Sequence, residues 1–267
     1  MTSGGFGATE RGGQTPQPAS QTEGAASVAP RCIACVQPRR GHGVTVATYY
    51  LAQALAGRGL RALVMDLTGR RARLQWLAAR GQTPGLTIWA PHIPQPERLG
   101  DALARAREQA AGKVDVILLD MDASYLQRAG GVAAGIDYAL IFIEHSEMGM
   151  READALAERL DESPPPWGVV AAVFTRVNAS SLHDLPQSTP ERGLPVLGEL
   201  PADYLLAAGD DYSLKGEEPR APHDTYLGAV NRLARSLVQM AQIVSGAHVA
   251  SPQPSRTPPD TSGPSSP

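Results

Sequence analysis

The most informative part of the sequence is QPRRGHGVTVATYYLAQALAGRG, residues 37–59. It follows CIACV, residues 32–36, which is an apolar run of strand length. A loop with Gly41 and Gly43 comes next, and residues with helical spacing then extend from about Thr45 to Arg58. A glycine loop that joins a buried strand to the start of a helix presents backbone N–H groups to an anion. This loop contains no lysine.

Six further apolar runs predict strands, and segments with helical spacing separate most of them. The predicted strands are 61–66, 85–90, 114–120, 137–144, 167–175 and 195–201, and the predicted helices are 71–81, 97–111, 148–160 and 224–245. Near-continuous Val, Ile and Leu indicate strands that are buried on both faces. We therefore predict an α/β fold with a doubly wound, mostly parallel sheet and helices on both faces. Its ligands should bind beyond the carboxyl ends of the strands.

The two ends of the chain differ from the middle in composition. Residues 1–30 are mostly Gly, Thr, Ser, Gln, Ala and Pro, and residues 250–267 are rich in Ser, Pro and Thr. Such segments have too little apolar surface to offset chain entropy, so we expect two disordered tails around one domain over 31–249. The sequence contains no signal peptide and no apolar stretch of transmembrane length, which favours a cytoplasmic protein.

The cysteines give no sign of a zinc site, and the net charge gives no sign of a particular partner. Cys32 and Cys35 have C-x-x-C spacing, but strand residues three apart face opposite sides, and no second Cys/His pair completes a zinc site. We therefore expect both thiols in the core. The net charge of −3 favours no class of partner. Of the 24 basic residues only Lys113 and Lys215 are lysines.

The loop matches the phosphate-binding loop pattern G-x-x-x-x-G-K-[ST] in part. Aligned on Thr45, the octet is PRRGHGVT, in which Gly43 and Thr45 match. Pro38 stands in place of the first glycine, and Val44 in place of the lysine.

Taken together, the loop and the segments after it resemble the ParA/MinD family of deviant Walker-A P-loop ATPases. The resemblance covers about residues 31–245. It rests on Arg39 at the position of the family's signature lysine and on the order and spacing of the later segments. Those segments are LAQALAGRGLRALVMDLTGR (51–70), VDVILLDMDA (114–123), DYALIFIEHSEMGMREADAL (137–156), GVVAAVFTRVN (168–178) and PVLGELPADYLLAAG (195–209).

The resemblance implies a site for ATP or ADP with Mg²⁺. The implied nucleotide-binding residues are Arg39, Arg40, Gly41, His42, Gly43, Val44, Thr45, Val46, Thr175 and Pro201, and the implied metal-site residues are Thr45, Asp66 and Asp120. Family members are dimeric ATP-driven switches that act with protein partners of a larger machine. The resemblance thus implies a homodimer, either free in the cytoplasm or peripheral to a membrane complex.

Departures from the family pattern predict weakened nucleotide binding and slow or absent hydrolysis. Val44 cannot neutralise phosphate as a lysine does, and Arg40 replaces a motif glycine. The family's D-x-D motif is Asp66-Leu67-Thr68 here, and Thr175 stands where an asparagine is common. The branches of the family that serve pilus assembly and cellulose secretion often have altered loop lysines. In this respect the chain resembles those branches more than the partition ATPases.

Three alternatives remain open from the sequence. Each residue has a structural interpretation: Thr45 as a helix N-cap, Asp120 as a loop cap, and the glycines as a tight turn. The chain as a whole can be a nucleotide-free pseudo-ATPase scaffold. It can also be a DNA-binding partition protein, because RGLRALVMDLTGRRARLQWLAAR (58–80) carries six arginines, although we favour no nucleic-acid partner.

Overall fold

The computed structural model describes residues 29–39, 41, 43–68, 77, 83–90, 98–128, 135–161, 169–177, 188–189, 191–203 and 223–243. Seven strands form one sheet in the order β3-β2-β4-β1-β5-β6-β7, and every pair of neighbours is parallel. The strands are β1 (Arg31–Gln37), β2 (Ala62–Asp66), β3 (Leu86–Trp89), β4 (Val116–Asp122), β5 (Tyr138–Glu144), β6 (Val169–Val177) and β7 (Val196–Pro201).

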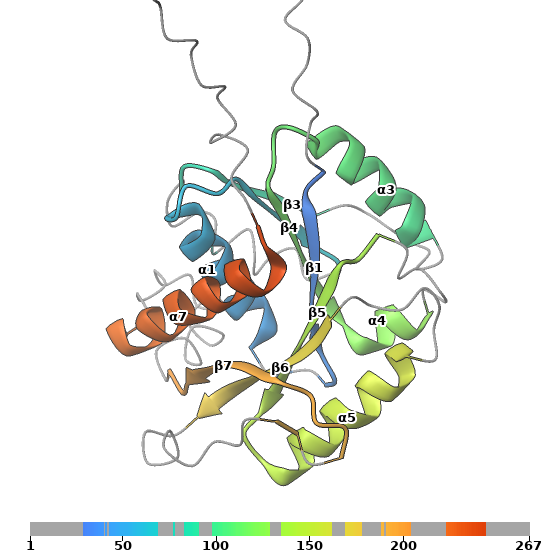
Figure 1. The fold of residues 1–267 in the computed structure, drawn as a ribbon, viewed down its shortest axis with the longest axis vertical. Coiled ribbons are helices and arrows are strands. Elements are labelled where there is room, and N and C mark those ends of the chain that lie inside the picture. Colours follow the sequence, from blue (N-terminus) through green and yellow to red (C-terminus); the bar gives the residue numbers. More distant parts are fainter. Residues whose placement is uncertain are drawn as a thin grey trace, which may run out of the picture.

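Helices cover both faces of the sheet (Figure 1). Helices α1 (Val44–Ala56) and α7 (Asp224–Ala241) pack on one face. Helices α3 (Leu99–Ala110), α4 (Ala123–Arg128) and α5 (Glu147–Asp161) pack on the other. The fold is therefore the doubly wound α/β arrangement that the sequence predicts, with an entirely parallel sheet.

The position of β1 explains why its loop is the place to look for a ligand. It lies in the middle of the sheet, between β4 and β5. The chain moves from β1 out to β2 and β3 on one side, and later to β5, β6 and β7 on the other. In open α/β sheets, ligands bind at the carboxyl ends of strands where the chain changes direction in this way. The loop after β1 is at that point.

The two cysteines are core residues, as the strand alternation predicts. Cys32 packs in the cluster under α3, α4 and α5, and Cys35 packs in the cluster under α1 and α7. Both are fully buried free thiols. Burial raises the pKa of Cys35 to about 12 and raises that of Cys32 as well, so both thiols stay protonated at neutral pH.

All seven predicted strands are present, and the differences lie at their ends and in the helices. Strand β4 runs to Asp122, two residues beyond the prediction. Helix α4 was not predicted, because six residues are too few to show helical spacing. The last helix ends at Ala241 rather than at 245. The predicted helix over 71–81 lies outside the described residues apart from Leu77, and so do both predicted tails apart from Ala29 and Pro30. No helix in the described ranges is long and apolar enough to cross a membrane.

Candidate nucleotide-binding site

The loop between β1 and α1 turns through two glycines in the left-handed region. Gly41 has φ 100° and Gly43 has φ 77°, a conformation that glycine adopts without the steric cost of a Cβ. A Cβ on either residue would meet no atom within 4 Å, so the backbone conformation and not crowding requires glycine here. Arg40 and His42, which the sequence also assigns to the site, lie outside the described residues.

Helix α1 begins without a side-chain cap. Gly43 is its N-cap residue, so the interpretation of Thr45 as the N-cap is wrong. The first intrahelical bond runs from the Ala47 N–H to the Gly43 carbonyl, 2.9 Å. The N–H groups of the first turn, at Val44, Thr45 and Val46, precede that bond and have no partner within the helix. Such a helix start attracts an anion through its oriented N–H groups and the helix dipole.

The residue at the lysine position is part of the core. Val44 is 1% exposed and packs in the cluster under α1 and α7, and Val46 is 5% exposed in the same cluster. Thr45, between them, is partly exposed. The side chain at 44 therefore contributes packing, and this helix start offers phosphate its backbone and the Thr45 hydroxyl.

Two buried carboxylates lie on neighbouring strands at the carboxyl edge of the sheet. Asp66 in β2 and Asp120 in β4 are register partners and are 3% and 0% exposed. Val64 and Leu118, two residues earlier in each strand, pack against α1 and α7, so strand alternation places both aspartates on the α1 face. Asp120 does not cap a loop, because β4 continues past it to Asp122.

The environment of Asp66 suits a bound cation. Its Oδ1 accepts hydrogen bonds from the Thr68 N–H at 2.9 Å and from the Thr68 hydroxyl at 2.7 Å. Its Oδ2 is buried and accepts no hydrogen bond from a described residue. Two buried carboxylates side by side favour a nearby cation. Mg²⁺ prefers oxygen ligands of this kind, so the residues fit the ion that the resemblance implies.

These carboxylates do not form a complete metal cage by themselves. Among the described residues, no group of three or more His, Cys, Asp or Glu side chains is placed to hold a metal ion. A magnesium ion at this edge therefore needs further oxygen ligands, such as the Thr45 hydroxyl and phosphate oxygens. Mg²⁺ in phosphate-binding sites is usually held by one or two protein carboxylates together with the substrate.

Arg39, at the position of the signature lysine, points to α5. Its guanidinium forms an ion pair and hydrogen bonds with Glu152. That hydrogen bond raises the pKa of Arg39. The side chain of Arg39 is 57% exposed and that of Glu152 is 22% exposed. The charge of Arg39 is thus balanced within the chain.

The residues expected to frame a base lie at the ends of β6 and β7. Thr175 is buried, and its hydroxyl donates to the Ile143 carbonyl of β5 at 3.1 Å. Pro201 ends β7 and is the register partner of Val177. Next to Thr175, Arg176 reaches the loop, where its Nη2 donates to the Gly41 carbonyl at 2.6 Å.

Sequence reasoning missed three features of this edge. One is the Arg176 contact with the loop, and another is Glu152 as the partner of Arg39. The third is the hydrogen bond of 2.6 Å that Gln37 Nε2 donates to Asp122, the last residues of β1 and β4. An arginine directly after a predicted strand end was a usable signal for Arg176. Nothing in the sequence pairs the other residues.

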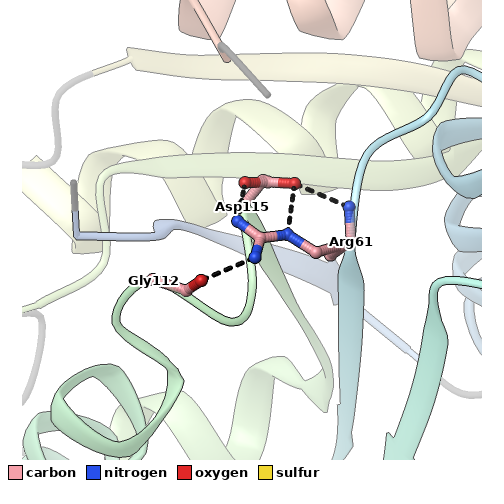
Figure 2. A network of polar contacts seen from close by, with 3 residues as sticks. All are labelled: Arg61, Gly112 and Asp115. Atoms are coloured by element: carbon pink, nitrogen blue, oxygen red, sulfur yellow. Dashed lines mark hydrogen bonds and ion pairs between the residues drawn. The ribbon is translucent and has the colours of Figure 1, made fainter. Parts of the chain in front are cut away.

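Two of the six arginines of the arginine-rich segment have structural roles. Arg61 binds Asp115 through its backbone N–H, Nε and Nη2, and its Nη1 donates to the Gly112 carbonyl at 2.6 Å (Figure 2). Arg58 donates to both the side chain and the carbonyl of Asn231 on α7. The other four arginines lie outside the described residues. Both described arginines of this segment therefore form hydrogen bonds that hold separate parts of the fold together.

Solved structures share this fold. No protein-family model and no curated protein sequence matches the chain. MinD in the MinC:MinD complex of Aquifex aeolicus is 16% identical, with 78% of this chain and 96% of that chain covered and a TM-score of 0.58. A ParA family ATPase from Chlorobium tepidum is 17% identical, with 78% of this chain and 98% of that chain covered and a TM-score of 0.51.

A third similar structure contains a nucleotide analogue. It is cobyrinic acid a,c-diamide synthase from Mycobacterium smegmatis with bound ATP analogue and magnesium. It is 16% identical, with 80% of this chain and 96% of that chain covered and a TM-score of 0.56. At these identities the likeness establishes the fold, which is that of the MinD and ParA-family P-loop ATPases.

Proposed function

We propose that this chain is a nucleotide-binding switch of the ParA/MinD type that positions or regulates a cellular machine, with weak or absent ATP hydrolysis. The observation that carries the proposal is the edge of the sheet around the start of α1. There, an uncapped helix follows a glycine loop, and the buried carboxylates of Asp66 and Asp120 lie on the same face as that helix. An N–H-rich helix start beside carboxylates fits a phosphate group with its Mg²⁺.

Each residue has a role in the proposed complex. The N–H groups of Val44, Thr45 and Val46 bind phosphate oxygens. The Thr45 hydroxyl would be a ligand of a bound Mg²⁺, and the carboxylates of Asp120 and Asp66 would help to hold that ion. When bound, Mg²⁺ would supply neutralisation of the phosphate charge. At the ends of β6 and β7, Thr175 and Pro201 border the base.

The proposed affinity is lower than that of an intact P-loop. A lysine at position 44 would place a positive charge on the phosphates, and this chain has a core valine there. The neighbouring motif also lacks its second carboxylate, because residue 68 is a threonine, and the hydroxyl of Thr68 donates to Asp66. Both differences remove groups that stabilise the transition state of phosphoryl transfer, so binding should persist more than hydrolysis.

The proposed partners are a second copy of the chain and a protein of the machine that it serves. One of the similar structures is a complex of MinD with MinC, which supports a role in protein assembly. Partition, polysaccharide secretion and pilus assembly are the machines that the resemblance suggests. We propose a location in the cytoplasm, peripheral to a membrane complex in the last two cases.

A nucleotide-free scaffold is the second candidate. Two observations favour it: Val44 is packed in the core, and the charge of Arg39 is balanced by Glu152. Equilibrium titration with a fluorescent ATP analogue, with and without Mg²⁺, separates the two candidates. The switch should bind in a saturable, Mg²⁺-enhanced manner and form more dimer by light scattering. A scaffold should show neither response.

A further inference from the structure

Strand β6 contains an irregularity where it passes the loop. Phe174 pairs with Glu199 and Val177 pairs with Pro201, so β6 has one more residue than β7 in this interval. Phe174 and Val177 also pack in the same core cluster, although residues three apart on a regular strand face opposite sides. The interval is a β-bulge, a feature that is frequent beside active sites and changes the direction of a side chain.

Arg176 is the residue whose direction the bulge changes. Its φ is 56°, a left-handed conformation that is costly for a residue with a long side chain. The other described non-glycine residue with positive φ is Gln242, at the C-cap of α7, where that conformation is ordinary. Regular alternation would turn Arg176 toward the face of α3, α4 and α5. Instead it is exposed, and its Nη2 donates to the Gly41 carbonyl at 2.6 Å.

The described residues around the loop differ in whether they carry a positive charge that is not already balanced by a carboxylate. Val44 brings none, and the charge of Arg39 is balanced by Glu152. Arg176 takes part in none of the ion pairs formed by the described residues, and the Gly41 carbonyl to which it donates is a neutral group. A guanidinium has five N–H donors in a fixed fork, which suits a phosphate group. One of these donors is engaged by Gly41.

We propose that Arg176 binds the phosphates of the nucleotide and supplies the positive charge that Val44 cannot. This inference rests on the proposed function, and it assigns to β6 a charge that the described residues of the loop do not supply. The strained bulge and the contact with Gly41 hold the guanidinium at the loop before the ligand arrives. An independent feature points to the same ligand: Oδ2 of Asp66, buried at this edge, accepts no hydrogen bond from a described residue and suits the accompanying Mg²⁺.

Calorimetric titrations with MgADP and with magnesium pyrophosphate test the assignment. Pyrophosphate carries the charge without the base, so it isolates the phosphate contact. Arg176→Gln should lower the affinity for both ligands by a similar factor, roughly 10- to 100-fold, which is the effect expected from losing one charged hydrogen bond. Arg176→Lys, which keeps the charge, should recover part of the loss. Arg105→Gln is the matched control, because Arg105 is an exposed arginine of α3 that bonds to its own helix.

Several outcomes would overturn the assignment while the proposed function stands. They are wild-type affinity for MgADP in Arg176→Gln, a loss confined to MgADP, or failure of pyrophosphate to bind the wild-type protein. If Arg176→Lys bound the ligands no more tightly than Arg176→Gln, and both variants kept the wild-type thermal stability, Arg176 would only shape the loop through Gly41. If neither MgADP nor magnesium pyrophosphate bound to the wild-type protein, both the assignment and the proposed function would be wrong.

Discussion

Arg39 and Glu152 join the loop after β1 to helix α5. They are 113 residues apart in the sequence and form an ion pair with the guanidinium on one carboxylate oxygen. The other carboxylate oxygen of Glu152 is buried and accepts no hydrogen bond from a described residue. The position of the signature lysine in the family that the chain resembles is thus occupied by an arginine with a partner inside the chain.

Removing that partner should release Arg39 toward phosphate. We expect Glu152→Gln to strengthen MgATP binding by roughly two- to fivefold, the scale of one solvent-exposed ion pair. Glu147→Gln is the control, because Glu147 pairs with Arg151 on the exposed side of the same helix. The gain should disappear when Arg39→Ala is added, and Arg39→Ala alone should weaken both binding and any ATP-dependent dimer. An affinity unchanged by Glu152→Gln would show that the ion pair with Glu152 does not hold Arg39 away from phosphate.

ATP hydrolysis should be slow or absent. Val44 lies in the core and Thr68 donates its hydroxyl to Asp66, so neither side chain stabilises the charge of a transferring phosphoryl group. Loss of one such contact typically lowers kcat by about 10²–10³-fold. Phosphate release under saturating MgATP is the measurement. Turnover at the rate of an ordinary P-loop ATPase would contradict the prediction.

The Arg61–Asp115 pair should stabilise the fold independently of any ligand. Asp115 is buried, with 3% of its side chain exposed, and it accepts from Arg61 at 2.7 Å through both carboxylate oxygens. Arg61→Ala leaves this carboxylate with fewer donors, so we expect a loss of about 1–3 kcal/mol. The thermal midpoint should fall by roughly 3–10 °C. Arg105→Ala should change it little, and equal midpoints for the two variants would refute the stabilising role.

The buried thiols should make the protein less stable at alkaline pH. The pKa of Cys35 is about 12 in the folded state because of burial, against 9.0 for an ordinary thiol, and that of Cys32 is also raised. Above pH 9 the unfolded chain releases these protons while the folded chain keeps them. Stability should therefore be fully present below pH 9 and decline toward pH 12, by up to about 1.4 kcal/mol per pH unit for each thiol.

Urea unfolding of the wild-type protein and of Cys32→Ala/Cys35→Ala between pH 8.5 and 10.5 tests this. The double variant should lose less stability across that range, and the folded wild-type protein should resist alkylation at pH 8. Parallel pH profiles for the two proteins would show that the thiols do not titrate as proposed.

The sheet was predictable from the sequence because buried parallel strands need apolar runs, and those runs are separated by polar loops. Asp66 and Asp120 were assigned from the family resemblance, and the structure makes them register partners on neighbouring parallel strands. Contacts between distant segments were not predictable. The bulge that turns Arg176 toward Gly41 depends on the register of β6 with β7, and the pairing of Arg39 with Glu152 depends on how α5 packs.

Calorimetry with MgATP on the wild-type protein tests the central claim most directly, namely that this loop still binds nucleotide. We predict a saturable heat with an affinity roughly 10- to 100-fold weaker than that of an intact P-loop, as expected when one charged hydrogen bond is lost. Val44→Lys should strengthen binding, provided that circular dichroism shows it folded, because position 44 is 1% exposed. No heat at millimolar MgATP, with none restored by a folded Val44→Lys variant, would contradict the claim and favour the scaffold.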